Sequence, residues 1–149
     1  MAYSPAMREL VQRVARASVR VPDSPKAREP ISEIGPGLLV LLGVSREDGA
    51  AQAERLAAKV RALRIFPDAQ GNMNEALGER EILCVSQFTL YGDARRGNRP
   101  SFVAAAPGEQ AEPLYELFCE LAGAKRGAFG AHMLVELVND GPVTLMLEA

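Results

Sequence analysis

The apolar run from Leu38 to Val44 constrains the fold of this chain more than any other feature. Successive side chains of a strand point to opposite faces, so a run without polar side chains predicts a strand that is covered on both faces. A second stretch, Ile82 to Gly92, begins with four apolar residues and ends at a glycine. It predicts another buried strand, and we expect the chain to be organised around it.

The segments around these two runs predict a mixed α and β domain. Further strands are expected at 7–21, 133–138 and 143–147. Helices are expected at 45–63, 101–106 and 109–121. Gly123 is a suitable stop for the last helix. Three prolines between positions 22 and 30 exclude a central strand there, so 22–33 is interpreted as a surface loop.

The composition indicates one soluble domain, which we take to span 1–149. The chain is long enough to bury a core of its own. No apolar run approaches the length of a membrane span, and the first residues lack the pattern of a signal peptide. Cys84 and Cys119 are far apart in apolar contexts, which indicates reduced core residues and a cytoplasmic location.

The end of the second strand is unusually polar, because Ser86, Gln87 and Thr89 follow the apolar residues. In a strand, Gln87 and Thr89 share one face while Ser86 and Phe88 share the other. A buried polar group without a partner costs about 1–3 kcal/mol, so something must satisfy these side chains. Either neighbouring backbone does so, or the strand end lines a pocket and its polar groups face a ligand.

The loop after this strand holds Arg95, Arg96 and Arg99. It is either a solvated surface loop or a grip for an anion such as phosphate, and its place next to the polar strand end adds weight to the second interpretation. The formal net charge of −2 argues against broad, nonspecific binding of nucleic acid, which needs an electropositive surface. Recognition of a short nucleic-acid end remains compatible with it.

Conventional catalytic groups are scarce. His132 is the only histidine, and nothing near it in the sequence suggests a Ser-His-Asp arrangement. The chain has no CxxC pair, no histidine pair at helical spacing and no calcium loop, so no metal site and no cofactor are predicted. A Gly141–Pro142 bond between two strands is either an ordinary trans bond in a turn or, less commonly, cis.

Taken together, these residues resemble the D-aminoacyl-tRNA deacylase family of the bacterial and eukaryotic type. The likeness runs from Met7 to Glu148. Its most specific motifs are Ser86-Gln87-Phe88-Thr89-Leu90, Arg99-Pro100-Ser101-Phe102 and Asn139-Asp140-Gly141-Pro142-Val143-Thr144. The resemblance implies a three-layer β/β/α sandwich, in which helices lie against one of two β-sheets. It also implies a homodimer with two pockets at the subunit interface.

The resemblance implies an enzyme that hydrolyses the ester of D-aminoacyl-tRNA at the 3′-terminal adenosine. Ser86, Gln87, Phe88 and Thr89 would line the ester, and Phe129 and Met133 would pack on the adenine. Gly141–Pro142 would be a cis dipeptide that enters the partner's pocket and rejects L side chains by steric exclusion. Backbone N–H groups near Phe88 and Thr89 would stabilise the oxyanion.

Part of the reactivity expected for ester hydrolysis comes from the substrate. A ribose hydroxyl could activate water without a protein base, and Thr89 is interpreted as a positioning residue before a nucleophile because no adjacent base is visible. Glycine has no side chain to exclude, so glycyl-tRNA should be cleaved as well. Two other functions stay open: a non-catalytic module that binds tRNA 3′ ends, and an esterase for small molecules.

Three features depart from the pattern of this family. Residues 1–6 are an N-terminal extension, the proline-rich loop at 22–33 is longer than usual, and the segment from Leu121 to Gly130 is shorter. The shortening lies close to the expected adenine pocket and bears on the placement of Phe129. His132 stands where an acidic residue is common, and no role is assigned to it.

Overall fold

The computed structural model describes residues 6–149, so residues 1–5 of the expected N-terminal extension lie outside the described part. The helices are α1 (Ala50–Ala62) and α2 (Gly108–Ala122), and a short 3-10 turn, η1, spans Phe88–Tyr91. The strands are β1 (Arg8–Arg20), β2 (Ser32–Ile34), β3 (Gly37–Gly43), β4 (Phe66–Pro67), β5 (Met73–Glu75), β6 (Glu81–Ser86), β7 (Lys125–Arg126) and β8 (Leu134–Glu148).

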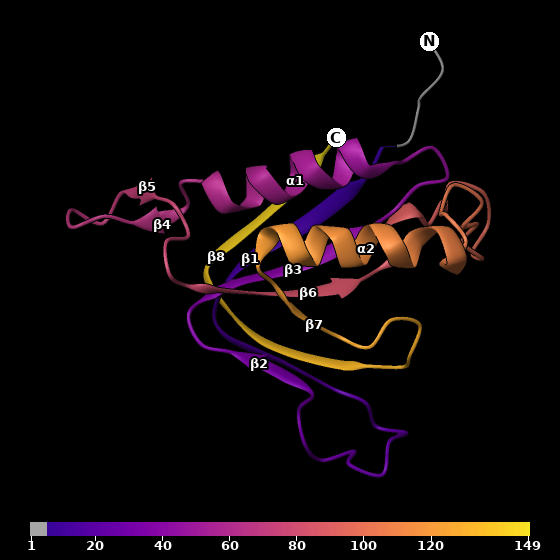
Figure 1. The fold of residues 1–149 in the computed structure, drawn as a ribbon, viewed down its shortest axis with the longest axis horizontal. Helices are drawn as coiled ribbons and strands as arrows, with labels where there is room; N and C mark the ends of the chain where they lie inside the picture. Colours follow the sequence, from indigo (N-terminus) through magenta and orange to yellow (C-terminus); the bar gives the residue numbers. More distant parts are fainter. Residues whose placement is uncertain (1–5) are drawn as a thin grey trace.

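Most strands belong to one mixed sheet built on the long strand β1. Leu10 of β1 pairs with Leu41 of β3 and with Met146 of β8, so these two strands flank β1 on opposite edges. The sheet continues from β3 through parallel β6 to β7, and β2 pairs with the far end of β1. The strands curl, which carries β2 and the first half of β8 to the side of the sheet away from α1 and α2 (Figure 1).

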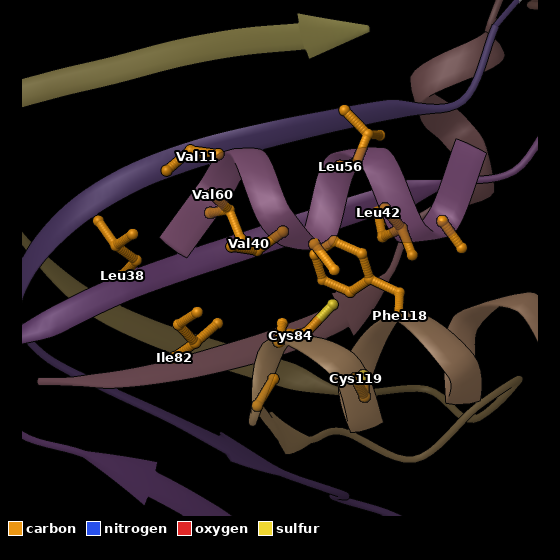
Figure 2. Packing of buried hydrophobic residues seen from close by; sticks show 14 of the residues in the cluster. Val11, Leu38, Val40, Leu42, Leu56, Val60, Ile82, Cys84, Phe118 and Cys119 are labelled. Atoms are coloured by element: carbon orange, nitrogen blue, oxygen red, sulfur yellow. The ribbon is translucent and has the colours of Figure 1, made fainter. Parts of the chain in front are cut away.

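The curled sheet encloses two apolar cores, one on each face of β3. Leu38, Val40 and Leu42 point to the core under the helices, where Figure 2 shows Val40 and Leu42 close to Val60 and Phe118. Leu39 points the other way, into a smaller core with residues of β1, β2, β6 and β8. The expectation that this strand is covered on both faces is confirmed, as is the three-layer arrangement with helices against one side.

The second apolar run forms a strand only as far as Ser86, so the expected strand through Gly92 is too long. The Gln87 N–H still donates to the Leu42 carbonyl (2.8 Å), but the Leu90 N–H then donates back to the Gln87 carbonyl (3.2 Å) and closes η1. The prediction that Gln87 and Thr89 share a strand face is therefore wrong. The position of this turn depends on the hydrogen bond to β3, which the local sequence pattern does not reveal.

Two helix predictions also need correction. The segment 101–106 is not helical, because its backbone pairs with distant residues: Ser101 bridges to Asp93, and the Ala106 N–H donates to the Val44 carbonyl (2.9 Å). Helix α1 begins at Ala50 rather than at 45–48. Asp48 instead accepts hydrogen bonds from the N–H groups of Ser45 (2.6 Å) and Met7 (3.0 Å), which ties the loop to β1.

The two strands expected at 133–138 and 143–147 form a single strand, β8, that runs through Gly141–Pro142. Its pairing with β1 jumps from Asn139 opposite Val14 to Thr144 opposite Gln12, so 140–143 bulge out of the ladder. The Asn139 side-chain amide donates to the carbonyls of Arg13 (2.9 Å) and Val143 (3.1 Å) and bridges this gap. Within 22–33 the prolines lie in a loop as expected, with Pro22 and Pro25 in turns, but Ser32 and Glu33 already belong to β2.

Candidate functional site

A pocket of about 460 Å³ opens at the carboxyl end of β6. One wall is formed by Ser86, Gln87 and Phe88, where β6 ends and η1 begins. The facing wall is the loop before β8, which contributes Phe129, His132 and Met133, and the start of α2 closes the floor. The structure therefore brings together the polar end of β6 and both residues that the resemblance assigned to adenine. Phe129 lines the pocket, as the resemblance implies.

Tyr115 of α2 holds the loop wall in place, although the sequence analysis did not single it out. Its hydroxyl donates to the Cys84 carbonyl of β6 (2.8 Å) and accepts from the Gly127 N–H (3.2 Å). Its ring contacts the Phe129 ring, with centroids 5.8 Å apart. Burial raises the pKa of Tyr115 well above its usual value, so the phenol stays protonated. The sequence signal that could have identified Tyr115 is its place within the apolar stripe of a helix, because a buried tyrosine hydroxyl needs hydrogen-bond partners.

The turn η1 presents two backbone donors next to the pocket. The first N–H groups of a helical turn have no acceptor within the turn, and those of Phe88 and Thr89 have none among residues 6–149. The Phe88 ring is 55% exposed and meets the Phe102 ring edge-on at 5.1 Å. The Gln87 side-chain amide donates to the Thr89 hydroxyl. An amide is no base, so this contact orients Thr89 and does not activate it.

Gly141–Pro142 is an exposed, well-anchored segment whose peptide bond is cis. Arg13 donates to the carbonyls of Asp140 (3.1 Å) and Ile65 (2.6 Å) and also lies 3.6 Å from the Asp140 carboxylate. Gly141 has φ +139°, and a Cβ there would lie 2.7 Å from the Val143 side chain. Only glycine fits this position.

Within one chain, Gly141–Pro142 does not reach the pocket. The dipeptide lies opposite Arg13, which is in register with Leu38 and, through it, with Ile82 near the start of β6. The first residue of β6 that lines the pocket, Val85, is three residues further along. At about 3.3 Å per residue this is roughly 10 Å along the strand, and the dipeptide is also separated from β6 by two intervening strands. The Ser86–Leu90 and Asn139–Thr144 motifs are therefore at different places on the surface of the protomer.

The three arginines of the 92–100 loop are not equivalent. Arg95 makes two hydrogen bonds to the Asp93 carboxylate (2.9 and 2.7 Å), and these hold the pKa of Asp93 at about 2. Arg96 and Arg99 are exposed and have no anionic partner among residues 6–149. Both border the same surface depression as Asp93 and Arg95. Of the three, Arg96 and Arg99 are the residues free to bind an anion.

His132 stands at the pocket rim, where its Nδ1 lies 3.4 Å from the Asp23 carboxylate of the proline-rich loop. The sequence analysis assigned no role to His132. In the structure, its contact with Asp23 brings the proline-rich loop to the edge of the pocket. Among residues 6–149 no group of three or more metal-binding side chains is found. No helix in this part of the chain is both long and apolar enough to cross a membrane.

Comparison with known proteins gives consistent matches over nearly the whole chain. A family model described as D-Tyr-tRNA(Tyr) deacylase matches residues 10–148. Proteins named D-aminoacyl-tRNA deacylase from Symbiobacterium thermophilum and Anaeromyxobacter dehalogenans are 53% and 54% identical, each over 96% of this chain and 96% and 97% of their own length.

Two solved structures have similar folds. The structure described as c-Myc DNA Unwinding Element Binding Protein has a TM-score of 0.86 and 44% identity over 95% of this chain and 98% of its own. A probable eukaryotic D-amino acid tRNA deacylase has a TM-score of 0.82 over 97% of this chain and 100% of its own. Its identity of 16% supports the likeness of fold alone.

Proposed function

Because the chain belongs to the D-Tyr-tRNA(Tyr) deacylase family, we propose that it hydrolyses the ester between a D-amino acid and the 3′-terminal adenosine of tRNA. The products are the free D-amino acid and tRNA. The observation that carries this proposal is the pocket at the end of β6, which lies directly beside two unoccupied backbone N–H donors. Two buried free cysteines support a reducing, cytoplasmic location.

The terminal adenosine occupies the pocket, with its base against Phe129 and Met133. The volume of about 460 Å³ is in the usual range for a small-ligand site. Proteins hold unpaired RNA bases by stacking them on aromatic rings, and the Phe129 ring is kept in place by its contact with Tyr115. The Ala128 N–H lies 3.3 Å from the Met133 sulfur, which fixes the second side chain.

The ester carbonyl lies over the start of η1, between Ser86 and Thr89. The N–H groups of Phe88 and Thr89 donate to the oxyanion that forms when water attacks; loss of one such donor costs roughly 10²–10³ in rate in other enzymes. A ribose hydroxyl of the substrate activates the water, so the protein supplies no base. Gln87 and Thr89, which are hydrogen-bonded to each other, keep the ester in position.

Selection against L-amino acids comes from a second protomer. Gly141–Pro142 is exposed and too far from the pocket of its own chain, but in a homodimer it can enter the pocket of the partner. One edge of β8 is unpaired among residues 6–149, and its exposed apolar side chains, Val138, Leu145 and Met146, support burial against a second copy. The inserted main chain leaves no room for an L side chain, whereas a D side chain points away from it.

The tRNA backbone beyond the terminal nucleotide passes over the arginine loop. Arg96 and Arg99 are available for phosphate contacts, while Arg95 is neutralised by Asp93 and contributes least. With a net charge of −2, the protein relies on this local positive surface.

The deciding experiment compares release of amino acid from D-aminoacyl-tRNA and from the same tRNA carrying the L enantiomer. We expect hydrolysis of the D ester only. Binding of both without cleavage would favour a non-catalytic module for tRNA 3′ ends. Equal cleavage of simple esters that lack RNA would favour a small-molecule esterase.

Glycyl-tRNA, for example glycine mischarged on tRNA(Ala), should be cleaved at a rate close to that of the D ester. Glycine has no side chain for the inserted main chain to reject. The measurement is release of labelled glycine with L-alanyl-tRNA as the resistant control. If glycyl-tRNA resisted hydrolysis as L-alanyl-tRNA does, selection by steric exclusion would be contradicted.

A further inference from the structure

We propose that Tyr91 and Arg8 are positioning residues for this deacylation, because together they fix the orientation of η1 from outside the pocket. The inference rests on the proposed function, in which the N–H groups of Phe88 and Thr89 bind the oxyanion. A backbone donor is useful only when its N–H points at the position of the developing charge. In a turn of four residues, that direction is decided by what holds the turn.

Tyr91, the last residue of η1, is buried and anchors the turn to the core. Its hydroxyl has the carbonyl oxygens of Ala6 and Gly43 as acceptors, the latter at 3.1 Å, and shares its one proton between them. Burial raises its pKa far above the usual value for tyrosine, so the donor stays protonated. The Tyr91 ring packs closely against Gly43. A Cβ on residue 43 would lie 2.9 Å from this ring and 3.3 Å from the Gln87 carbonyl oxygen.

Arg8 holds the same end of η1 through a different contact. Its guanidinium donates to the Leu90 carbonyl (2.9 Å), lies 5.0 Å from the centre of the Tyr91 ring and pairs with Glu148 at 3.2 Å. The other end of η1 is tied to β3 by the Gln87 N–H. The turn is therefore fixed at both ends, and its two unoccupied donors keep a single direction.

Met7, which joins Ala6 to Arg8, is itself held to two other segments by backbone hydrogen bonds. The Met7 N–H donates to the Asp48 carboxylate (3.0 Å), and the Met7 carbonyl accepts from the Ala149 N–H (3.0 Å). Neither Tyr91 nor Arg8 lines the pocket. Their removal should therefore disturb the direction of the oxyanion donors without removing a contact to bound adenosine.

The test measures kcat and KM of Tyr91→Phe and Arg8→Gln on D-aminoacyl-tRNA, well below the unfolding temperature of each variant. It also measures their affinity for two stable analogues of the D-aminoacyl-adenosine end, a planar amide and an anionic tetrahedral phosphonate. We expect kcat and phosphonate affinity to fall together by about ten- to a hundredfold, because a misplacement of about 1 Å can cost roughly 10²-fold in rate. KM and amide affinity should change less than about twofold, and Arg8→Lys should recover part of the loss.

Arg61→Gln is the matched control, since Arg61 also donates to a backbone carbonyl (Ala122, 2.7 Å) but between the helices. It should lower thermal stability and leave the ratio of phosphonate to amide affinity unchanged. An unchanged kcat in both test variants, or equal weakening of the two analogues, would overturn this inference while an active wild type still supports the proposed function. A wild type without activity on D-aminoacyl-tRNA would overturn both.

Discussion

At the scale of single residues, Glu9 has the most unfavourable environment in the described chain. It is fully buried in β1, between Leu42 of β3 and Leu147 of β8, and neither carboxylate oxygen has a hydrogen-bond partner among residues 6–149. Burial without a partner raises the pKa of Glu9 from 4.5 to about 8. At neutral pH the folded protein therefore keeps this carboxyl protonated, whereas the unfolded chain releases the proton.

This difference makes stability depend on pH. Between pH 4.5 and 8 the folded state binds one more proton than the unfolded state, so stability is highest below 4.5 and falls as the pH rises to about 8. From pH 6 to pH 9 the wild type should lose about 2–3 kcal/mol through Glu9. In Glu9→Gln this loss should disappear, as measured by denaturant unfolding at both pH values.

The exposed Glu54→Gln on α1 is the control and should retain the pH dependence of the wild type. An equal loss of stability in wild type and Glu9→Gln would show that the carboxyl of Glu9 does not titrate in this range.

At the scale of secondary-structure elements, the pocket depends on one tyrosine that joins α2, β6 and the loop before β8. Tyr115→Phe keeps the ring contact with Phe129 but removes the hydroxyl that binds the Cys84 carbonyl and the Gly127 N–H. We expect a loss of about 1–3 kcal/mol in stability, because buried polar groups lose a partner.

The wall that carries Phe129 and Met133 should also become mobile, so KM for D-aminoacyl-tRNA should rise severalfold while kcat changes little. Steady-state kinetics and thermal unfolding check both effects. A loss confined to kcat would indicate that Tyr115 acts on η1 rather than on the adenosine wall.

At the scale of the whole molecule, the separation of Gly141–Pro142 from the pocket implies that one active site needs two chains. Gly141→Ala should be inactive, because its Cβ would clash with Val143 and displace the dipeptide. Phe129→Ala should be inactive for a different reason, loss of the ring that holds the adenine. In a mixed dimer, the intact pocket of the first variant receives the intact dipeptide of the second.

Co-expression of these two inactive variants should therefore restore about a quarter of wild-type activity, since half of randomly formed dimers are mixed and each has one intact site. Separately purified variants that cannot exchange subunits serve as the control. Activity that stays at the level of the single variants would contradict a site shared between protomers.

Hydrophobic periodicity was enough to locate the buried strands and helices α1 and α2, because it reports which faces of a segment must be buried. Leu38 to Val44 lies in the interior, and the buried face of α1, from Ala53 to Val60, packs in the core under the helices. The polar end of β6 was also recognisable, since its side chains needed partners, whereas Phe129 and Met133 were indicated by the family resemblance alone.

Tertiary structure alone decided the details that shape the site. The turn after Ser86 depends on the Leu42 carbonyl, the extended course of 101–106 on Val44 and Asp93, and the bulge at Gly141 on Arg13 and Asn139. The different states of Arg95 and Arg96 depend on which of them reaches Asp93. Each of these details is fixed by one or two hydrogen bonds between specific groups, and hydrophobic periodicity does not encode such bonds. The core is instead fixed by the burial of many side chains, which hydrophobic periodicity does encode.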